Sequence, residues 1–305
     1  MVEAEGMSLL QVIVLALIQG ITEFLPVSSS AHLILPGKLL NWPDQGLAFD
    51  TSVHVGTLLA VLLFYRKDLL AMTSNIFAFV FKRCSLNDYG KMFIYMCIGT
   101  IPVGLVGMLA KGVVETYLRS ELVIACSTIV FGLVLLLAQM YNNKVIKNKS
   151  LALQNNNNDT INIDNNINKE NDVNCGISIK NAIIIGFAQA IALIPGTSRS
   201  GITLTAGYFL GLKPEHAAKF SFLLSIPVII LSALLSIKDL VTDTVVSHEL
   251  LTNMITSMCI GAILSFITAF FVIKIFLDYL TKLGLVPYVL YRIVLGAVLL
   301  AILYC

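Results

Sequence analysis

Charged residues are scarce in this chain. They make up 12% of its 305 residues, against about 25% in a typical soluble protein, while hydrophobic residues make up 57%. A sequence this poor in charge cannot cover a water-facing surface, which excludes an ordinary soluble domain. The net charge of only +2, with basic residues spread along the chain, also excludes nucleic acid as a partner.

Two other common features are missing. No basic residue precedes Lys38, and Glu3 and Glu5 stand before the first apolar run, so we expect no cleaved signal peptide. The six cysteines include no C-x-x-C pair. We therefore expect the thiols to pack as small hydrophobic groups, without a disulfide framework or a cysteine metal site.

Long apolar runs are abundant instead. A helix needs about 20 residues to cross the hydrocarbon layer of a membrane. Runs close to this length lie at 47–65, 92–110, 121–141, 218–237, 253–277 and 285–304. The sequence therefore predicts an all-α polytopic membrane protein with six transmembrane helices. A shorter run at 69–81 is expected at the membrane interface or as an extension of the neighbouring span.

Two further apolar stretches, 9–40 and 182–212, are each interrupted by a proline and small hydroxyl residues. The breaks begin at Pro26 and Pro195. Non-helical backbone at membrane depth is tolerated only where it is buried in protein or lines a water-filled cavity. We therefore predict two re-entrant hairpins, each consisting of a helix, a break and a helix that returns to its own side.

The order of these elements repeats, since each hairpin is followed by three spans. An odd number of crossings inverts the second copy, which predicts an inverted repeat with the site between the copies. The first repeat would cover 1–141 and the second 179–305. The intervening segment 142–178 is rich in Asn and charge, so we predict an unstructured cytoplasmic linker.

The distribution of Lys and Arg predicts the orientation. Most of the twenty basic residues lie in or beside 66–91, 142–181 and 278–285. The positive-inside rule places these segments in the cytoplasm and both termini outside.

Gln19 and Glu23 are four residues apart on the first half of the first hairpin, so they point along one helix face. An ionisable group inside a membrane indicates a functional site. The alternatives are a position near the membrane surface or a structural ion pair with Arg199. The same two residues are the tentative ligands of a loosely held Mg²⁺ or Ca²⁺, the kind of ion that keeps several waters.

Ser28, Ser29 and Ser30 follow the break at Pro26, and His32 comes shortly after. Hydroxyls and free N–H groups at the start of a half-helix attract phosphate. A hydroxyl near a base in a polar pocket is typical of an activated nucleophile. A serine taken alone is more often a helix cap.

The second break carries an arginine among hydroxyls and glycines. Its residues are Gly196, Thr197, Ser198, Arg199, Ser200 and Gly201. An arginine keeps its charge and presents a planar fork suited to phosphate oxygens. At membrane depth it needs an anion, which Glu23 would supply at rest and phosphate when substrate binds. We therefore predict a phosphate clamp here.

Four other polar residues lie close to the ends of apolar runs. Asp50 and His54 begin an outside-to-inside span, where a polar span end and a substrate contact are equally good interpretations. Tyr291 and Arg292 lie a turn or two into the last span, and we predict that they snorkel to the cytoplasmic interface.

The two breaks resemble the signatures of a known family, the undecaprenyl-pyrophosphate phosphatases associated with bacitracin resistance. The stretch from Gln19 to His32 looks like the E/Q-x-x-x-E and P-x-S-S-x-x-H patterns, and Pro195 to Gly201 looks like P-G-x-S-R-S-G. The similarity spans nearly the whole chain except the Asn-rich insert. Many members have Glu at the position of Gln19, a departure that weakens the case for a metal more than that for phosphate binding.

The resemblance implies hydrolysis of undecaprenyl pyrophosphate to undecaprenyl phosphate and inorganic phosphate, at the outer face of the bacterial plasma membrane. The reaction recycles the carrier lipid for cell-wall polymers. Carried onto this chain, it implies that Gln19 and Glu23 position a cation or water. Arg199, with Ser198 and Ser200, would hold the pyrophosphate.

Ser29 would then be the nucleophile and His32 the general acid and base. The reverse assignment, with His32 as nucleophile, stays open. The rival function is a transporter or flippase of a polyprenyl phosphate, since carriers also use inverted repeats and broken helices. A base beside a hydroxyl is needed for hydrolysis and not for transport, so His32 favours the enzyme. The expected partners are the lipid substrate and the bilayer, with a homodimer left open.

Overall fold

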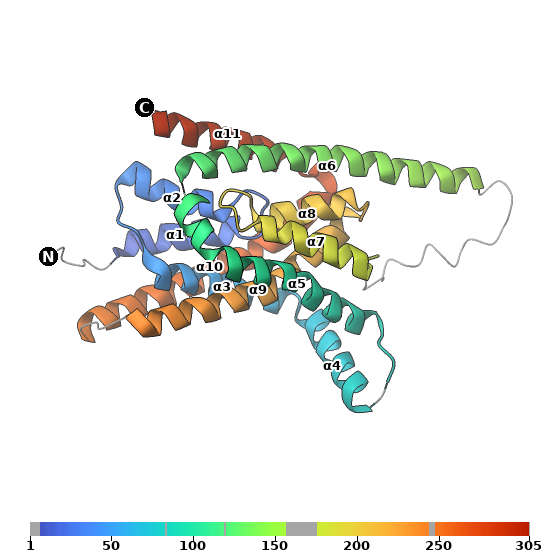
Figure 1. The fold of residues 1–305 in the computed structure, drawn as a ribbon, viewed down its shortest axis with the longest axis horizontal. Helices are drawn as coiled ribbons and strands as arrows, with labels where there is room; N and C mark the ends of the chain where they lie inside the picture. Colours follow the sequence, from blue (N-terminus) through green and yellow to red (C-terminus); the bar gives the residue numbers. More distant parts are fainter. Residues whose placement is uncertain (1–6, 83, 119, 157–175, 244–247, 305) are drawn as a thin grey trace.

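The computed structural model describes residues 7–82, 84–118, 120–156, 176–243 and 248–304. All regular structure within these ranges is helical (Figure 1). In chain order the elements are α1 (Leu9–Thr22), α2 (Ser29–Leu40), α3 (Gly46–Phe64), α4 (Arg66–Lys82), α5 (Asp88–Val113), the π-helical turn η1 (Val114–Leu118), α6 (Glu121–Asn156), α7 (Ile179–Ile191), α8 (Arg199–Phe209), α9 (Pro214–Asp243), α10 (His248–Leu283) and α11 (Val286–Tyr304).

Six of the described helices are long and apolar enough to cross a membrane: α3, α5, α6, α9, α10 and α11. They coincide with the six apolar runs, so the prediction of an all-α polytopic membrane protein is confirmed at this level. Their outer surfaces are apolar as well. Leu109 on α5 is 86% exposed and Phe271 on α10 is 57% exposed, which suits contact with lipid chains.

The two shorter apolar helices, α1 and α7, begin at serine caps. Ser8 and Gln11 form a reciprocal capping box, in which each side chain accepts from the other residue's backbone N–H. At α7, the hydroxyl of Ser178 accepts from the backbone N–H of Asn181. Each helix ends where its break begins, and α2 and α8 follow the breaks.

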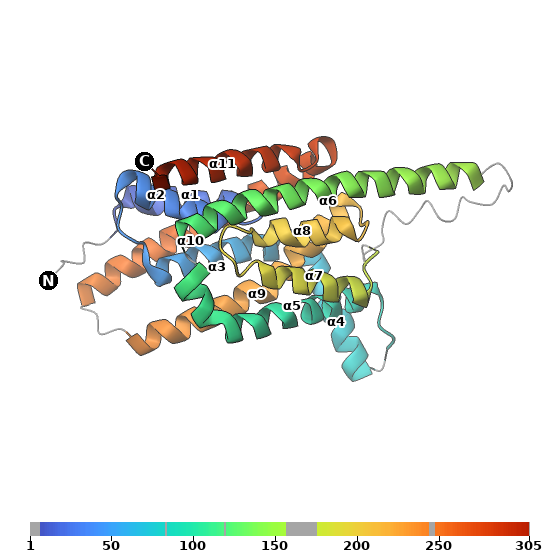
Figure 2. The same cartoon turned by 45° about the horizontal axis from the view of Figure 1, so that its top comes forward.

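The helix pairs place both breaks inside the bundle. The most extensive packing joins α3 to α10, α1 to α10, α6 to α11 and α5 to α7, while α8 packs on α6 and α9 (Figures 1 and 2). Phe24 of the first break is fully buried, and its ring meets that of Phe222 edge to face at 5.2 Å. Aromatic packing therefore fixes the first break against α9.

Close helix contacts depend on glycine. A Cβ added at Gly186 of α7 would lie 2.5 Å from the carbonyl oxygen of Gly99 on α5. A Cβ at Gly20 of α1 would lie 2.9 Å from the carbonyl oxygen of Ser265 on α10. The absence of a side chain lets each hairpin lie directly on a span.

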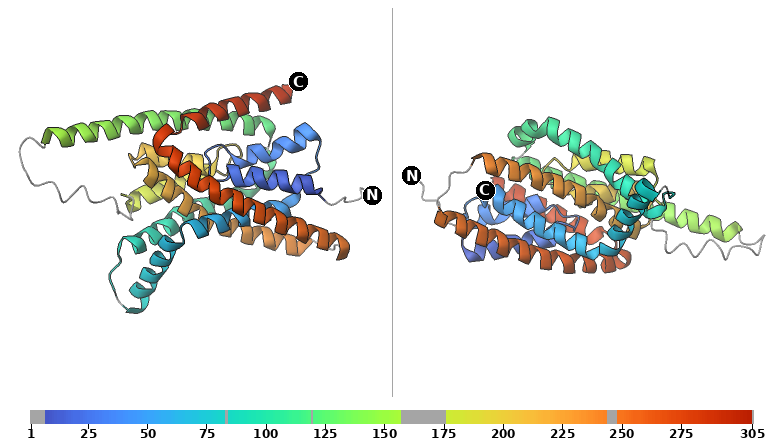
Figure 3. Two further views of the ribbon diagram at one scale, coloured as in Figure 1. Left: turned by 180° about the vertical axis from the view of Figure 1, so that it is seen from behind. Right: turned by 90° about the horizontal axis from the view of Figure 1, so that it is seen from below.

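Two segments differ from the sequence expectation. The run at 69–81 forms a separate helix, α4, which projects from the bundle, so it does not extend α3 (Figure 3). Asp68 at its start forms an ion pair of 2.8 Å with Lys219 of α9. This contact ties α4 to the body at one end.

The second difference is α6, which continues to Asn156 and extends past the neighbouring helices (Figure 1). The predicted linker therefore does not begin at 142. The buried side chain of Asn142 donates to the carbonyl oxygen of Leu212 at 2.9 Å, which anchors this part of the helix. Residues 157–175 of the predicted linker lie outside the described ranges.

Candidate active site

The two breaks share a backbone conformation. Ser28, which precedes α2, has φ 73° and ψ 97°, and Ser198, which precedes α8, has φ 70° and ψ 115°. A positive φ costs a non-glycine residue about 1–3 kcal/mol and persists only where its surroundings enforce it. Such strain at the start of both half-helices indicates that the breaks keep this backbone conformation at a cost in stability.

The breaks are hydrogen-bonded to each other. The backbone N–H of Gly196 donates to the hydroxyl of Ser30 at 3.3 Å. In the other direction, the hydroxyl of Ser200 donates to the carbonyl oxygen of Leu25 at 2.9 Å. The two segments, far apart in sequence, therefore form one unit.

Arg292 joins this unit from α11. Its guanidinium donates to the carbonyl oxygens of Pro26 at 3.3 Å, Gly196 at 3.0 Å and Thr128 at 3.0 Å. The residue is fully buried, so the prediction that it snorkels to the cytoplasmic interface is wrong. The breaks expose carbonyl oxygens that have no helical partner, and these satisfy the guanidinium within the protein.

The hydroxyl of Tyr291 is not free to snorkel to that interface either. Its hydroxyl lies 2.7 Å from Nε2 of His32, and the two rings stack with centroids 5.4 Å apart. The other ring nitrogen of His32, Nδ1, lies 2.7 Å from the carbonyl oxygen of Ser28. Both nitrogens of His32 therefore have partners other than Ser29.

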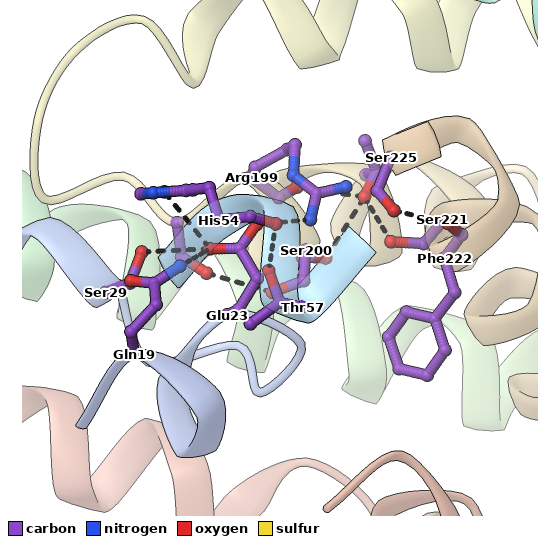
Figure 4. A network of polar contacts seen from close by, with 12 residues as sticks. Gln19, Glu23, Ser29, His54, Thr57, Arg199, Ser200, Ser221, Phe222 and Ser225 are labelled. Carbon is purple, nitrogen blue, oxygen red and sulfur yellow. Dashed lines mark hydrogen bonds and ion pairs between the residues drawn. The ribbon is translucent and has the colours of Figure 1, made fainter. Parts of the chain in front are cut away.

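Glu23 is the centre of a polar cluster (Figure 4). Its Oε1 accepts from the guanidinium of Arg199 at 2.8 Å, across the two halves of the chain. Its Oε2 accepts from the amide of Gln19 at 2.7 Å and the hydroxyl of Ser29 at 3.4 Å. Nε2 of His54 lies 3.7 Å from the same oxygen. One carboxylate thus contacts a cation, an amide, a hydroxyl and an imidazole.

Two cavities meet at this cluster. The first, of about 350 Å³, is lined by Glu23, Ser28, Ser29, Ser30, Ser198, Arg199, Asp50, Thr51, His54 and residues of α9 that include Ser232 and Ser236. The second, of about 410 Å³, is lined by Ser29, Ser30, Asp44, Gln45, Asp50, His54 and the apolar side chains of Leu33, Ile34, Leu47, Ile124 and Pro195. Ser29 and His54 border both cavities, so reactants on either side can reach them.

Four of the other expected residues lie behind the cavity wall. Gln19 and Thr197 are fully buried, as are Ser200 and Gly201 of α8. The hydroxyl of Ser198 accepts from the backbone N–H of Gly201 at 3.1 Å, which caps α8. Gln19, Thr197, Ser200 and Gly201 support the walls, whereas Ser198 borders the first cavity together with Glu23, Ser29 and Arg199.

His54 is the residue that sequence reasoning left undecided and that the structure brings into the cluster. The spacing of the polar residues in the sequence did indicate its position. Asp50 and His54 are four residues apart on α3, so both face one side of that helix, and both border the cavities. The sequence does not reveal that this side of α3 meets the first break.

These features define a class: an all-helical, multi-span membrane protein in which a buried carboxylate, a hydroxyl and an arginine meet at a cavity suited to an anion. The chain belongs to the family described as bacitracin resistance protein BacA, whose model matches residues 12–298.

Curated relatives cover almost the same length. The chain is 46% identical over 290 residues to the undecaprenyl-diphosphatase of Alcanivorax borkumensis, covering 95% of this chain and 97% of the relative. It is 45% identical over 296 residues to undecaprenyl-diphosphatase 2 of Stutzerimonas stutzeri, covering 97% and 98%. It is 43% identical over 298 residues to the undecaprenyl-diphosphatase of Campylobacter concisus, covering 96% and 98%.

Proposed function

We propose that this protein hydrolyses undecaprenyl diphosphate to undecaprenyl phosphate and inorganic phosphate. Family membership and full-length relatives named as undecaprenyl-diphosphatases support the activity. The observation that carries the proposal is the ion pair of Glu23 with Arg199 at the cavity, with the Ser29 hydroxyl on the same carboxylate. These groups would bind a diphosphate and attack it.

Arg199 is our proposed clamp for the terminal phosphate. One of its terminal nitrogens, Nη2, contacts Glu23, while the other, Nη1, is buried and has no hydrogen-bond partner among the described residues. A guanidinium with an unused donor beside a cavity is ready for a second anion. The start of α8, where Arg199 is the first residue, adds a favourable helix dipole. Phosphate would then share the guanidinium with Glu23 or displace it.

Ser29 is our proposed nucleophile. It is the first residue of α2, and its hydroxyl donates to Oε2 of Glu23. A carboxylate in that position can take the serine proton as the oxygen attacks phosphorus. The role expected of His32, as acid–base group or as nucleophile, stays a prediction. It would require the His32 ring to leave the hydroxyl of Tyr291.

The described residues do not fit a resident metal ion. Glu23 Oε1 accepts from Arg199 and Oε2 from Gln19, and no group of three or more His, Cys, Asp or Glu side chains gathers within the described ranges. We propose that Mg²⁺ or Ca²⁺ would arrive bound to the diphosphate. No step of the proposed reaction depends on it.

We also propose that the two hairpins are re-entrant and that the two halves form an inverted repeat. The packing supports this arrangement: α1 lies on α10 and α7 lies on α5, which are equivalent pairs when the hairpins and spans are matched in order. The shared backbone of Ser28 and Ser198 supports it too. Together with the loop charges, this arrangement supports our proposal that the site faces the outer side of the bacterial plasma membrane. The homodimer stays a prediction.

The test is phosphate release from a polyprenyl diphosphate by the purified protein, compared with Arg199→Ala, Ser29→Ala and His32→Ala. Wild type should release one phosphate per substrate, while Arg199→Ala and Ser29→Ala should lose turnover. Full turnover in either variant would refute the assigned residue. If wild type released no phosphate, with or without divalent metal, but moved labelled lipid between leaflets, the transporter function would replace this proposal.

A further inference from the structure

The imidazole that contacts the Ser29–Glu23 pair is that of His54, on α3. Its side chain is 36% exposed, whereas that of Glu23 is 6% exposed. It also borders both cavities. His54 is therefore placed where water can reach a basic side chain next to the proposed nucleophile.

Its hydrogen bonds fix which ring nitrogen is available. Nδ1 of His54 lies 2.7 Å from the backbone carbonyl oxygen of Asp50. A carbonyl oxygen can only accept, so Nδ1 carries the hydrogen and donates. In the neutral ring Nε2 is then the nitrogen that carries the lone pair, and it is the atom that lies 3.7 Å from Oε2 of Glu23. The basic nitrogen faces the cluster.

The same reasoning gives the opposite result for His32. Its Nδ1 must donate to the carbonyl oxygen of Ser28, so its Nε2 accepts from the hydroxyl of Tyr291. Both positions of that ring are used. Of the two imidazoles near the breaks, only His54 presents an unused lone pair to the site.

The chemistry of the two half-reactions decides when such a base is needed. In the first, the Ser29 oxygen forms a bond to the terminal phosphorus and the bond to the bridging oxygen breaks. The serine proton passes to Glu23, and undecaprenyl phosphate leaves as an anion that is stable without a further proton. Glu23 is then protonated and can no longer act as a base.

We infer that His54 is the general base of the second half-reaction, a step that rests on the proposed function. A water molecule gives its proton to Nε2 of His54 while its oxygen bonds to the phosphorus of phosphoserine 29. The Ser29–phosphorus bond breaks, and the serine oxygen takes back the proton held by Glu23. Inorganic phosphate leaves, and His54 returns its proton to solvent through the cavity. Each group ends as it began.

The experiment uses His54→Gln, which keeps a polar side chain of similar size but removes the base. The full-length protein is mixed with a short-chain polyprenyl diphosphate, and monophosphate product, free phosphate and intact protein mass are followed together. His54→Gln should release one equivalent of polyprenyl monophosphate rapidly and then stall. Its mass should rise by one phosphoryl group, located on Ser29. Steady phosphate release should fall about 10²–10⁴-fold.

Two controls accompany this variant. His216→Gln removes an imidazole at the start of α9 that borders neither cavity, and it should turn over as wild type does. Ser29→Ala combined with His54→Gln should give neither the burst nor the added mass. Because only folded protein can phosphorylate itself, the trapped species also reports that the His54 variant is folded.

The outcomes separate this inference from the proposed function. If wild type turns over and His54→Gln does too, His54 is not the base. If His54→Gln loses turnover without a burst or added mass, His54 acts before the covalent step and the inference is overturned. If wild type itself releases no phosphate, the proposed function fails first.

Discussion

Glu23 and Arg199 come from opposite halves of the chain and neutralise each other inside the protein. Their side chains are 6% and 14% exposed. A buried pair gains little net stability, because desolvation offsets the attraction, but removing one partner leaves an uncompensated charge. A substitution at Arg199 therefore has a structural effect as well as a catalytic one, and the two must be separated.

A double substitution separates them. Arg199→Ala should lower the free energy of unfolding by about 3–5 kcal/mol, since Glu23 is left unpaired. Adding Glu23→Gln removes that charge and should restore most of the thermal stability in detergent. Turnover of polyprenyl diphosphate should fall at least about 10²–10³-fold in Arg199→Ala, as when one charge-stabilising donor is lost. It should not recover in the double variant, which also lacks the proposed base Glu23. Full turnover in the destabilised Arg199→Ala variant would mean that Arg199 is only structural.

Arg292 offers a second test at the scale of a residue. Arg292→Met keeps a long side chain but removes the guanidinium that donates to the carbonyl oxygens of Pro26, Gly196 and Thr128. Gly196 keeps the Thr128 hydroxyl as a donor, and Thr128 lies within α6. An unsatisfied buried acceptor costs about 1–3 kcal/mol, so loss of the donor to Pro26 should lower the free energy of unfolding by about that amount. Arg292→Lys, which keeps the charge on a compact group, should lose less. An unchanged melting temperature in the Met variant would contradict the bracing role.

The sequence identified which residue types would meet, but not all of the contacts. The breaks carry their own signal, since proline and serine interrupt apolar helix, and Glu23 and Arg199 stand out as charges in such stretches. The snorkelling prediction for Tyr291 and Arg292 failed because a position near the start of a helix is compatible with snorkelling as well as with burial. Only the three-dimensional arrangement brings α11 beside the breaks and gives Arg292 its carbonyl partners.

At the scale of elements, the hairpins depend on how closely α1 and α7 approach the spans. The contact of α7 with α5 is backbone to backbone, with Gly186 facing Gly99. No large side chains lie between the two helices at that point. Adding one methyl group there should displace the whole of α7, and with it the break that follows α7.

Gly186→Ala tests this contact. The added methyl group would lie 2.5 Å from the carbonyl oxygen of Gly99, so α7 must shift, at a cost of about 1–3 kcal/mol. The matched control is Gly112→Ala on α5, where a Cβ meets nothing within 4 Å. The melting temperature should fall for the first variant and not for the second. Equal stability of both would show that α7 adjusts freely.

Element boundaries were less predictable than element identities. The six spans follow from run length, because the membrane fixes how many apolar residues a helix needs. The continuation of α6 beyond 142 does not follow from hydropathy, since the segment is polar. It is held by a tertiary contact, the amide of Asn142 on the carbonyl oxygen of Leu212, and no local pattern reveals such a partner.

At the scale of the whole molecule, the two ends of the helix bundle differ in which parts of the chain they carry, and this difference bears on which side faces the cytoplasm. The start of α1 and the end of α11 lie on one side of the bundle, and the end of α6 lies on the other (Figure 1). The positive-inside rule assigns the second side to the cytoplasm, because the basic segments gather there.

Accessible cysteines test this orientation. In a background with the six native cysteines replaced, Ser120→Cys before α6 should react with an impermeant thiol reagent added to intact cells. Asn148→Cys, exposed near the far end of α6, should resist the reagent until the membrane is permeabilised. The reverse labelling pattern would overturn the predicted orientation.

The position of Arg292 on the last helix affects when the site can be assembled during synthesis. The two breaks are synthesised early and midway, so a growing chain contains Glu23, Ser29 and Arg199 well before it contains α11. Until that final helix emerges and inserts, the carbonyl oxygens of Pro26 and Gly196 lack the guanidinium that joins the two breaks. An unfinished chain thus carries the proposed reactive groups, with the breaks joined through Ser30 and Ser200 but without this brace, and we expect full activity only from the completed polypeptide.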